Sequence, residues 1–256
     1  MEKLDTVQNR AIRLYLGVHR FTPNKAVNAD MGWTSCRVRR YICMLRLWNR
    51  LVVMSANRIT RKIFDWDRIR NGWCTDIKKI LNSIGLGDSF DNCDPIDIMH
   101  ARDELHELQC ISWSNEVQNI PKLRTYIKFK QDYAREHYVV AINNRGHRSA
   151  LAQFRCGVLP LSIETGRFMS IPANLRLCNF CDENVVEDEV HFILYCSFYC
   201  ELRNLLLAKV STVIPDFISL NENEKMCALM GPLIVKHSAE FIYNAMYKRR
   251  KLLYRS

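Results

Sequence analysis

The chain of 256 residues is 48% hydrophobic and 25% charged, which excludes global disorder, and its net charge of +10 favours polyanionic partners, nucleic acid first. No apolar run approaches the roughly 18 residues that cross a bilayer, which excludes a membrane-spanning helix, and we expect no membrane partner. The polar start MEKLDTVQNR lacks the features of a secretory signal peptide, so we expect an intracellular protein, in the nucleus, the cytoplasm or both.

Helical periodicity dominates the first part of the chain. Apolar side chains recur at steps of three and four over residues 3–18, Thr22-Pro23 can start a second helix, and a third follows Trp33. The third helix carries five arginines, which predict either a solvated face or a strip that contacts a nucleic-acid backbone. These are Arg37, Arg39, Arg40, Arg46 and Arg50.

Two shorter helices are predicted over 58–70 and 73–84, and the stretch GLGDSFDNCDP over 85–95 gathers turn residues without an apolar period. We therefore expect a helical N-terminal part over 1–84, a linker over 85–95 and a helical C-terminal domain over 96–256. The predicted fold class is mainly α.

The C-terminal domain begins with a predicted helix over 96–117. LRTYIKFK (123–130) alternates weakly and is the one segment expected to be extended, whereas NNRGHR (143–148) is typical of a turn. Further helices are predicted over 148–157, 197–214 and 239–254.

A cysteine-rich element lies at about 176–203. The chain has 11 cysteines, and the stretch CNFCDENVVEDEVHFILYC within this element has the spacing C-x2-C-x9-H-x4-C. Cysteine thiolates and histidine nitrogens are the usual ligands of structural zinc. The predicted ligands are Cys178, Cys181, His191 and Cys196. The alternative is that these are ordinary thiols, kept reduced inside the cell, with an unrelated histidine.

The spacing of the last two ligands constrains the local fold. His191 and Cys196 are five residues apart, about 140° around an ideal helix, so both can bind one ion only if the helix begins near His191 or is distorted there. Cys200 is a substitute ligand, but it lies nearly opposite His191, so Cys196 is preferred. Because four protein ligands leave no open position, we expect a structural zinc that contributes folding free energy on the order of 10 kcal/mol.

Basic residues precede this element and are interleaved with Phe154 and Phe168. They predict a nucleic-acid surface on which cations contact phosphates and exposed rings stack on bases. The alternative is that both phenylalanines belong to the core and the arginines are merely solvated. The candidate residues are Arg145, His147, Arg148, Arg155, Arg167 and Arg176.

The tail YKRRKLLYR (247–255) is also basic. It predicts either a nuclear-import patch or a helix end whose cations complement the helix dipole.

Three blocks of the sequence resemble the carboxy-terminal part of the polyprotein of non-LTR retrotransposons, downstream of the reverse-transcriptase palm. LDTVQNRAIRLYLGVHRFTPNKAVNADMGWTSCRVRRYICMLRLWNRL (4–51) is similar to the helical thumb-like and connecting region after the polymerase core. RSALAQFRCGVLPLSIETGRF (148–168) is similar to the segment that leads into the terminal zinc element. RLCNFCDENVVEDEVHFILYCSFYCELR (176–203) is similar to the CCHC element itself.

The resemblance implies RNA-templated DNA synthesis at a nicked target for the complete family protein, with the CCHC element engaging RNA or DNA. It assigns the metal to the same four ligands. Polymerase chemistry needs an aspartate pair that holds Mg²⁺, and the sequence contains no Asp-Asp dipeptide. We therefore expect no catalytic residues and neither polymerase nor endonuclease activity from this chain.

Two functions remain open. The first is a catalytically empty helical fragment that binds RNA or single-stranded DNA through its zinc element and the basic neighbours. The second is a zinc-stabilised helical scaffold, domesticated or relic, whose partners are proteins. Salt-dependent binding of RNA or single-stranded DNA separates the two.

Overall fold

The computed structural model describes residues 2–70 and 72–253, apart from the side chain of Glu2. The described residues are mainly helical, which confirms the predicted fold class, and among them no β-strand forms beyond an isolated antiparallel bridge between Leu177 and Val186. None of the described helices is long and apolar enough to cross a membrane.

The chain divides into two compact units. The first unit comprises Thr34–Trp113 with the first residues of the chain, and the second comprises Thr6–Trp33 with the chain from Ser114 onward. The predicted division into 1–84 and 96–256 has different bounds. The second unit is discontinuous in sequence, since residues 6–33 belong to it together with the chain after residue 113.

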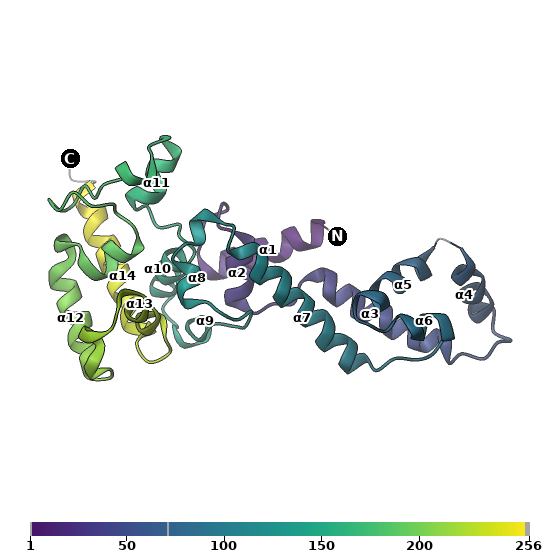
Figure 1. The fold of residues 1–256 in the computed structure, drawn as a ribbon. Coiled ribbons are helices and arrows are strands. Elements are labelled where there is room, and N and C mark those ends of the chain that lie inside the picture. Colours follow the sequence, from purple (N-terminus) through teal and green to yellow (C-terminus); the bar gives the residue numbers. More distant parts are fainter. Residues whose placement is uncertain (1, 71, 254–256) are drawn as a thin grey trace. The chain divides into compact units, whose positions relative to one another are not determined.

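The first unit is built from short and medium-length helices (Figure 1), and their buried side chains pack around Trp48. They are α3 (Cys36–Val52), α4 (Ile59–Ile69), α5 (Trp73–Ser83), α6 (Gly87–Asn92) and most of α7 (Ile98–Val117). The indole ring of Trp48 stacks on Phe90 with ring centroids 5.3 Å apart, and it meets the edge of Phe64 at 5.4 Å. Aromatic pairs of this geometry add stability beyond the area that they bury.

The segment 85–95, predicted as a linker, is part of this core. Phe90 on α6 is buried against Trp48, and the indole nitrogen of Trp48 donates to the carbonyl oxygen of Asp94. The side-chain amide of Asn49 binds both the N–H and the carbonyl oxygen of Ile96, at 2.9 and 2.7 Å. Turn residues shape the backbone here, but one buried ring and these hydrogen bonds hold it in place.

Helix α3 presents its arginines to solvent. Val38, Ile42, Leu45 and Trp48 fill the core from one side of the helix. The predicted strip lies on the remaining surface, where no acidic residue of the helix interrupts it. All five of its members are exposed: Arg37, Arg39, Arg40, Arg46 and Arg50.

The second unit contains all the remaining helices (Figure 1). α10 and α12 both pack on the long α14, and α13 packs on α8. The elements are α1 (Glu2–Leu16, mostly in this unit), α2 (Asn24–Met31), η1 (Pro121–Leu123), α8 (Tyr126–Phe129), α9 (His137–Ala141), α10 (Arg145–Arg155), α11 (Ser162–Phe168), η2 (Ala173–Leu175), η3 (His191–Tyr195), η4 (Ser197–Tyr199), α12 (Cys200–Ser211), η5 (Pro215–Ser219), α13 (Glu222–Met230) and α14 (Val235–Leu253).

Two local predictions in this unit are corrected. The segment 123–130 is not extended, because it contains the end of η1 and the single turn of α8, whose Tyr126 is buried in the core. The segment 143–148 is a helix start rather than a free turn, since Asn144 caps α10 by accepting a hydrogen bond from the N–H of His147. The last residues of the predicted helix and basic tail, 254 and 255, lie outside the described residues.

A buried ion pair crosses the core of the second unit. Nε and Nη2 of Arg155 lie 3.0 Å from the two carboxylate oxygens of Asp30, and neither side chain is exposed. The hydroxyls of Tyr126 and Tyr138 donate to the same carboxylate, and Glu136 binds Arg155 at 3.0 Å. Burial alone would lower the pKa of Arg155, but the two carboxylates raise it overall. The arginine is therefore permanently charged, and its ion pairs hold it inside the protein.

Candidate metal centre

The four predicted metal ligands converge at one point of the second unit. One ligand atom from each of Cys178, Cys181, His191 and Cys196 lies within 4.8 Å of all the others. The sulfurs of Cys178 and Cys196 are 3.8 Å apart, and the sulfur of Cys181 is 3.4 Å from Nε2 of His191. A disulfide needs sulfurs about 2.0 Å apart, so these are free thiols. The cluster can hold a metal ion.

The first two cysteines are placed by a short hairpin. The N–H of Cys178 donates to the carbonyl oxygen of Val185 at 2.8 Å, and the N–H of Glu187 donates to that of Arg176 at 3.0 Å. The chain reverses within the loop that the first of these bonds closes, with Asn184 in the left-handed region, at φ +51°, which asparagine tolerates better than most residues. The turn brings Cys181 back toward Cys178.

The last two ligands are brought together by a single π-helical turn. In η3 the N–H of Cys196 donates to the carbonyl oxygen of His191 at 2.8 Å, so residues five apart close one turn. Asp188 begins this turn by accepting the N–H groups of Val190 and His191. The predicted distortion of the helix is thus present. Cys200 is exposed at the start of α12 and is not among the clustered residues.

Arg203 holds the far end of the π-turn. It lies on α12 and is buried, and its guanidinium donates to the carbonyl oxygens of Ile193, Tyr195 and Cys196. Those carbonyls end a helical segment, where backbone donors are scarce, and among the three the carbonyl of Cys196 also accepts the N–H of Tyr199 at 3.2 Å. The orientation of Cys196 therefore depends on a residue outside the motif.

Glu187 ties the element to the helices around it. Its carboxylate accepts the N–H and the hydroxyl of Ser162 at 2.7 Å each and forms a buried ion pair with Arg249 of α14. Glu189, two residues on, accepts two hydrogen bonds from Arg124 and one from the hydroxyl of Thr125. Sequence reasoning missed both roles, although the run of three consecutive acids from Glu187 to Glu189 was visible.

The thiols of the cluster influence each other's protonation. The hydrogen bond with Cys196, followed by burial, raises the pKa of Cys178. The same bond lowers the pKa of Cys196, whose thiolate accepts it. Burial raises the pKa of Cys181. Without a cation the protonated form is therefore favoured for Cys178 and Cys181 but not for Cys196, whereas a bound cation would favour the thiolate of all three.

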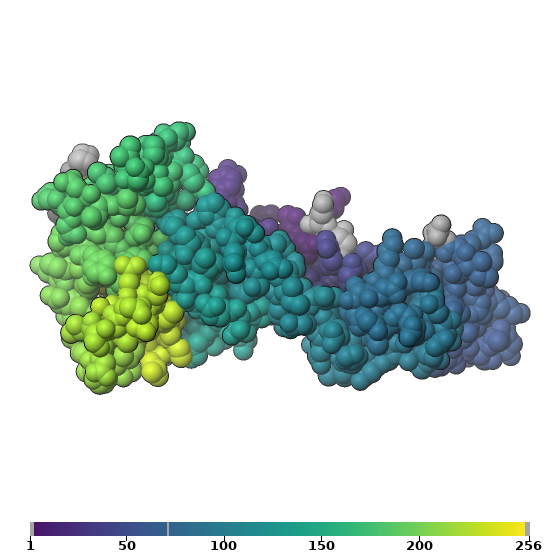
Figure 2. Space-filling model, viewed as in Figure 1, coloured from purple at the N-terminus to yellow at the C-terminus, as the bar shows by residue number. Residues whose placement is uncertain are grey.

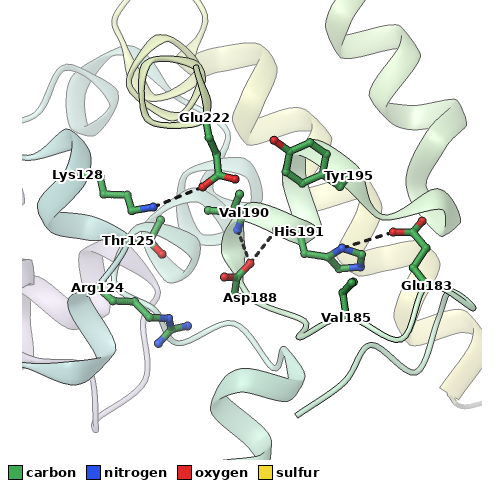
Figure 3. A pocket seen from close by; sticks show the side chains of 10 residues that line it. All are labelled: Arg124, Thr125, Lys128, Glu183, Val185, Asp188, Val190, His191, Tyr195 and Glu222. Carbon is green, nitrogen blue, oxygen red and sulfur yellow. Dashed lines mark hydrogen bonds and ion pairs between the residues drawn. The ribbon is translucent and has the colours of Figure 1, made fainter. Parts of the chain in front are cut away.

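A cavity of about 600 Å³ opens beside His191 (Figure 3). The Nδ1 side of the imidazole faces Glu183 at 3.9 Å, and across the cavity Lys128 lies 3.7 Å from Glu222. Asp188 adds a third carboxylate to the lining. The cavity is unsuited to phosphate because its carboxylates outnumber its cations once Arg124 is paired with Glu189.

The structure separates the predicted nucleic-acid residues into two groups. Arg155 is excluded from any surface by its ion pair with Asp30. Arg148 donates to the carbonyl oxygen of Ile142. Arg176 donates to the carbonyl oxygens of Ile163 and Ile171, and it is half-buried like Arg148. These three arginines position the backbone or the core.

The other three candidates reach solvent. Arg145 is exposed at the start of α10, His147 is half-buried against the ring of Tyr243, and Arg167 is exposed although it binds Glu164. Of the two phenylalanines, Phe154 belongs to the core and Phe168 is 68% exposed. In the basic tail, Arg249 is buried in an ion pair with Glu187, so it does not belong to an exposed basic surface.

Comparisons with known proteins identify no relative. The chain matches no known protein family, and no curated protein or solved structure is significantly similar to it.

Proposed function

We propose that Cys178, Cys181, His191 and Cys196 bind one structural Zn²⁺, and that the chain uses the element so formed to bind RNA or single-stranded DNA. The observation that carries the proposal is the convergence of four ligand atoms within 4.8 Å. Three soft sulfurs and one imidazole favour zinc over calcium or magnesium, which prefer oxygen ligands.

The distances support this choice of metal. Zinc–sulfur bonds of about 2.3 Å in a tetrahedron separate two sulfurs by about 3.8 Å, and a sulfur and a nitrogen by about 3.6 Å. The corresponding separations in the cluster are 3.8 Å for Cys178–Cys196 and 3.4 Å for Cys181–His191. Nε2 of His191 is the proposed ligand, and Glu183 on the Nδ1 side is placed to orient the ring.

The nucleic-acid part of the proposal is supported by charge. Three thiolates and a neutral imidazole around Zn²⁺ carry one net negative charge, so phosphates must be bound by cations outside the element. The chain has a net charge of +10, and Arg145 and Arg167 offer exposed guanidinium groups in the same unit as the element. Binding rather than catalysis is proposed because the sequence lacks the aspartate pair of a polymerase.

We also infer that the chain corresponds to the post-polymerase region of a non-LTR retrotransposon reverse transcriptase. Support comes from the three sequence blocks and from the CCHC spacing. The alternative, a zinc-stabilised scaffold for protein partners, is favoured by the acid-rich cavity beside His191, which suits cationic side chains better than phosphates.

A salt titration with charge variants tests nucleic-acid binding. The zinc-loaded chain should bind single-stranded RNA or DNA with an affinity that falls steeply as salt rises. Arg145→Gln with Arg167→Gln should weaken binding and reduce the salt slope by about 1 to 2. Arg46→Gln with Arg50→Gln is the matched control, because it removes the same charge from the first unit.

Three results are informative. Loss only in the Arg145/Arg167 variant supports the proposal. Loss only in the Arg46/Arg50 variant would move the binding surface to α3 of the first unit. Undetectable binding by the unmodified chain at low salt would reject nucleic-acid binding and leave the scaffold.

A further inference from the structure

A second cavity of the molecule, of about 240 Å³, lies in the second unit away from the four cysteine and histidine ligands. It forms between the turn that joins α1 to α2 and the segment from Val158 to α11. Pro160 and Leu159 contribute apolar surface, and the rings of Phe21 and Phe168 both line it. α11, which ends at Phe168, lies at the surface of its unit (Figures 1 and 2).

The two phenylalanines are conspicuous because they are exposed. Phe21 is 57% and Phe168 is 68% accessible, whereas large apolar rings in a fold of this size are normally buried. Each ring carries an arginine: Arg20 lies 4.6 Å from the centroid of Phe21, and Arg167 lies 5.5 Å from that of Phe168. Exposed aromatic surface rimmed by polar groups indicates a binding site.

The charge around the cavity is positive. Arg167 and Lys122 share the single carboxylate of Glu164, at 2.9 and 2.5 Å. Arg20 forms no ion pair with any residue that the structure describes. Lys122 and Glu164 are buried and neutralise each other, whereas Arg20 and Arg167 are exposed, so the net charge beside the two rings is about +2 and is complementary to a phosphate backbone.

We propose that Phe21 and Phe168 form a stacking platform for the bases of single-stranded nucleic acid, with Arg20 and Arg167 contacting the adjacent phosphates. This inference rests on the proposed nucleic-acid binding and names the groups that recognise the strand. The cavity is below the roughly 300–1,000 Å³ of small-molecule sites, whereas a base needs only a flat apolar face beside a cation. Bases of a duplex are stacked inside it and cannot reach such a platform.

Binding of a base-bearing and a base-free strand tests the platform. The zinc-loaded full chain is titrated with a labelled oligothymidylate of about 12 nucleotides and with an abasic strand of equal length, which keeps the phosphates but lacks the bases. The unmodified chain should prefer the base-bearing strand. Phe168→Ala and Phe21→Ala should each weaken binding of that strand about tenfold and leave the abasic strand within about twofold.

Two controls accompany these variants. Tyr247→Ala removes another exposed aromatic ring of the second unit that lies under a cation, Lys251, and should change neither affinity. Phe168→Trp should retain the preference for bases, since it keeps a stacking face. The thermal unfolding of each variant should match that of the parent because both phenylalanines lie outside the core.

The outcomes distinguish a failure of the stacking platform from a failure of nucleic-acid binding. Equal affinity of the unmodified chain for both strands would overturn the platform and leave nucleic-acid binding intact. Equal loss on both strands in the phenylalanine variants would also overturn it. Binding of neither strand at low salt would overturn the proposed function and, with it, the platform.

Discussion

The backbone N–H of Cys196 donates to the carbonyl oxygen of His191 across 2.8 Å, closing a turn of five residues. An α-helical turn would carry the two side chains to different sides of the helix, whereas this π-turn lets the sulfur and the imidazole nitrogen approach one point. The π-turn spans only His191–Tyr195, so it makes few hydrogen bonds of its own. Its stability depends on the residues that satisfy its two ends.

Arg203 is the residue whose loss should expose that dependence. Arg203→Ala removes the guanidinium that donates to the carbonyl oxygens of Ile193, Tyr195 and Cys196, so the π-turn relaxes. We expect zinc affinity to fall about 10- to 100-fold, as for other groups that hold ligands in place. Competition with a chromogenic chelator measures this. Arg203→Lys should recover little, because an ammonium cannot reach three carbonyls in the plane of a guanidinium; unchanged affinity in Arg203→Ala would show that the turn forms without it.

The buried ion pair of the second unit predicts a large loss of stability. Asp30→Ala removes the bidentate partner of Arg155, leaves only Glu136 to pair with this buried charge, and removes the acceptor of two tyrosine hydroxyls, so the free energy of unfolding should fall by about 3–5 kcal/mol. Denaturant unfolding followed by circular dichroism measures it. Glu240→Ala breaks the exposed pair with Lys209 and should cost less than about 1 kcal/mol. Similar values for the two variants would contradict a specific role of the buried pair.

Phe90 tests whether 85–95 belongs to the core of the first unit. Phe90→Ala removes the ring that stacks on Trp48 and should destabilise this unit by about 3–5 kcal/mol. Intrinsic fluorescence reports it, since every tryptophan except Trp33 belongs to the first unit. Asp88→Ala, an exposed change in the same segment, is the control. A flexible linker would give the same small effect for both.

Cysteine labelling should follow burial and ionisation. Burial, assisted by Asp67, raises the pKa of Cys74 to about 12 from an ordinary value of 9.0. A raised pKa means that folding disfavours this thiolate, so its contribution to stability is full below pH 9.0 and is lost as pH rises toward 12. At mildly alkaline pH, iodoacetamide should therefore modify the exposed Cys43 and Cys200 and spare Cys74.

The control for labelling is the denatured chain. In denaturant, Cys74 should react as fast as Cys43. Mass spectrometry of peptides identifies each modified residue. Fast labelling of Cys74 in the folded chain would show that the first unit opens readily around α5.

The sequence was most informative where local patterns determine the structure. The helices α3, α4, α5 and α7 were correctly predicted, and at α3 the periodic apolar residues also indicated the buried face, because a helix that buries one face must repeat at about 3.6 residues. The spacing predicted the four residues that the fold brings together as a candidate metal site, and the need for a distortion at His191 followed from the angle between residues on a helix.

Long-range pairing could not be predicted in this way. Asp30 and Arg155 are 125 positions apart. Arginine side chains are usually exposed, and nothing in the sequence around either residue indicates that this one is buried. Phe90 is a single aromatic residue among turn residues. Composition therefore predicted a linker over 85–95, although the ring of Phe90 packs in the core of the first unit. The roles of Glu187 and Glu189 depend on Arg249 and Arg124, which only the folded chain brings near.

The metal content of the purified chain decides whether the four clustered residues bind zinc. Elemental analysis should find one zinc per chain, retained in Cys200→Ser and lost in Cys178→Ser and in Cys196→Ser. Cobalt substitution should add the absorption bands of a tetrahedral thiolate site in the parent and in Cys200→Ser only. A chain without zinc, or full zinc content in both the Cys178 and Cys196 variants, would contradict the account.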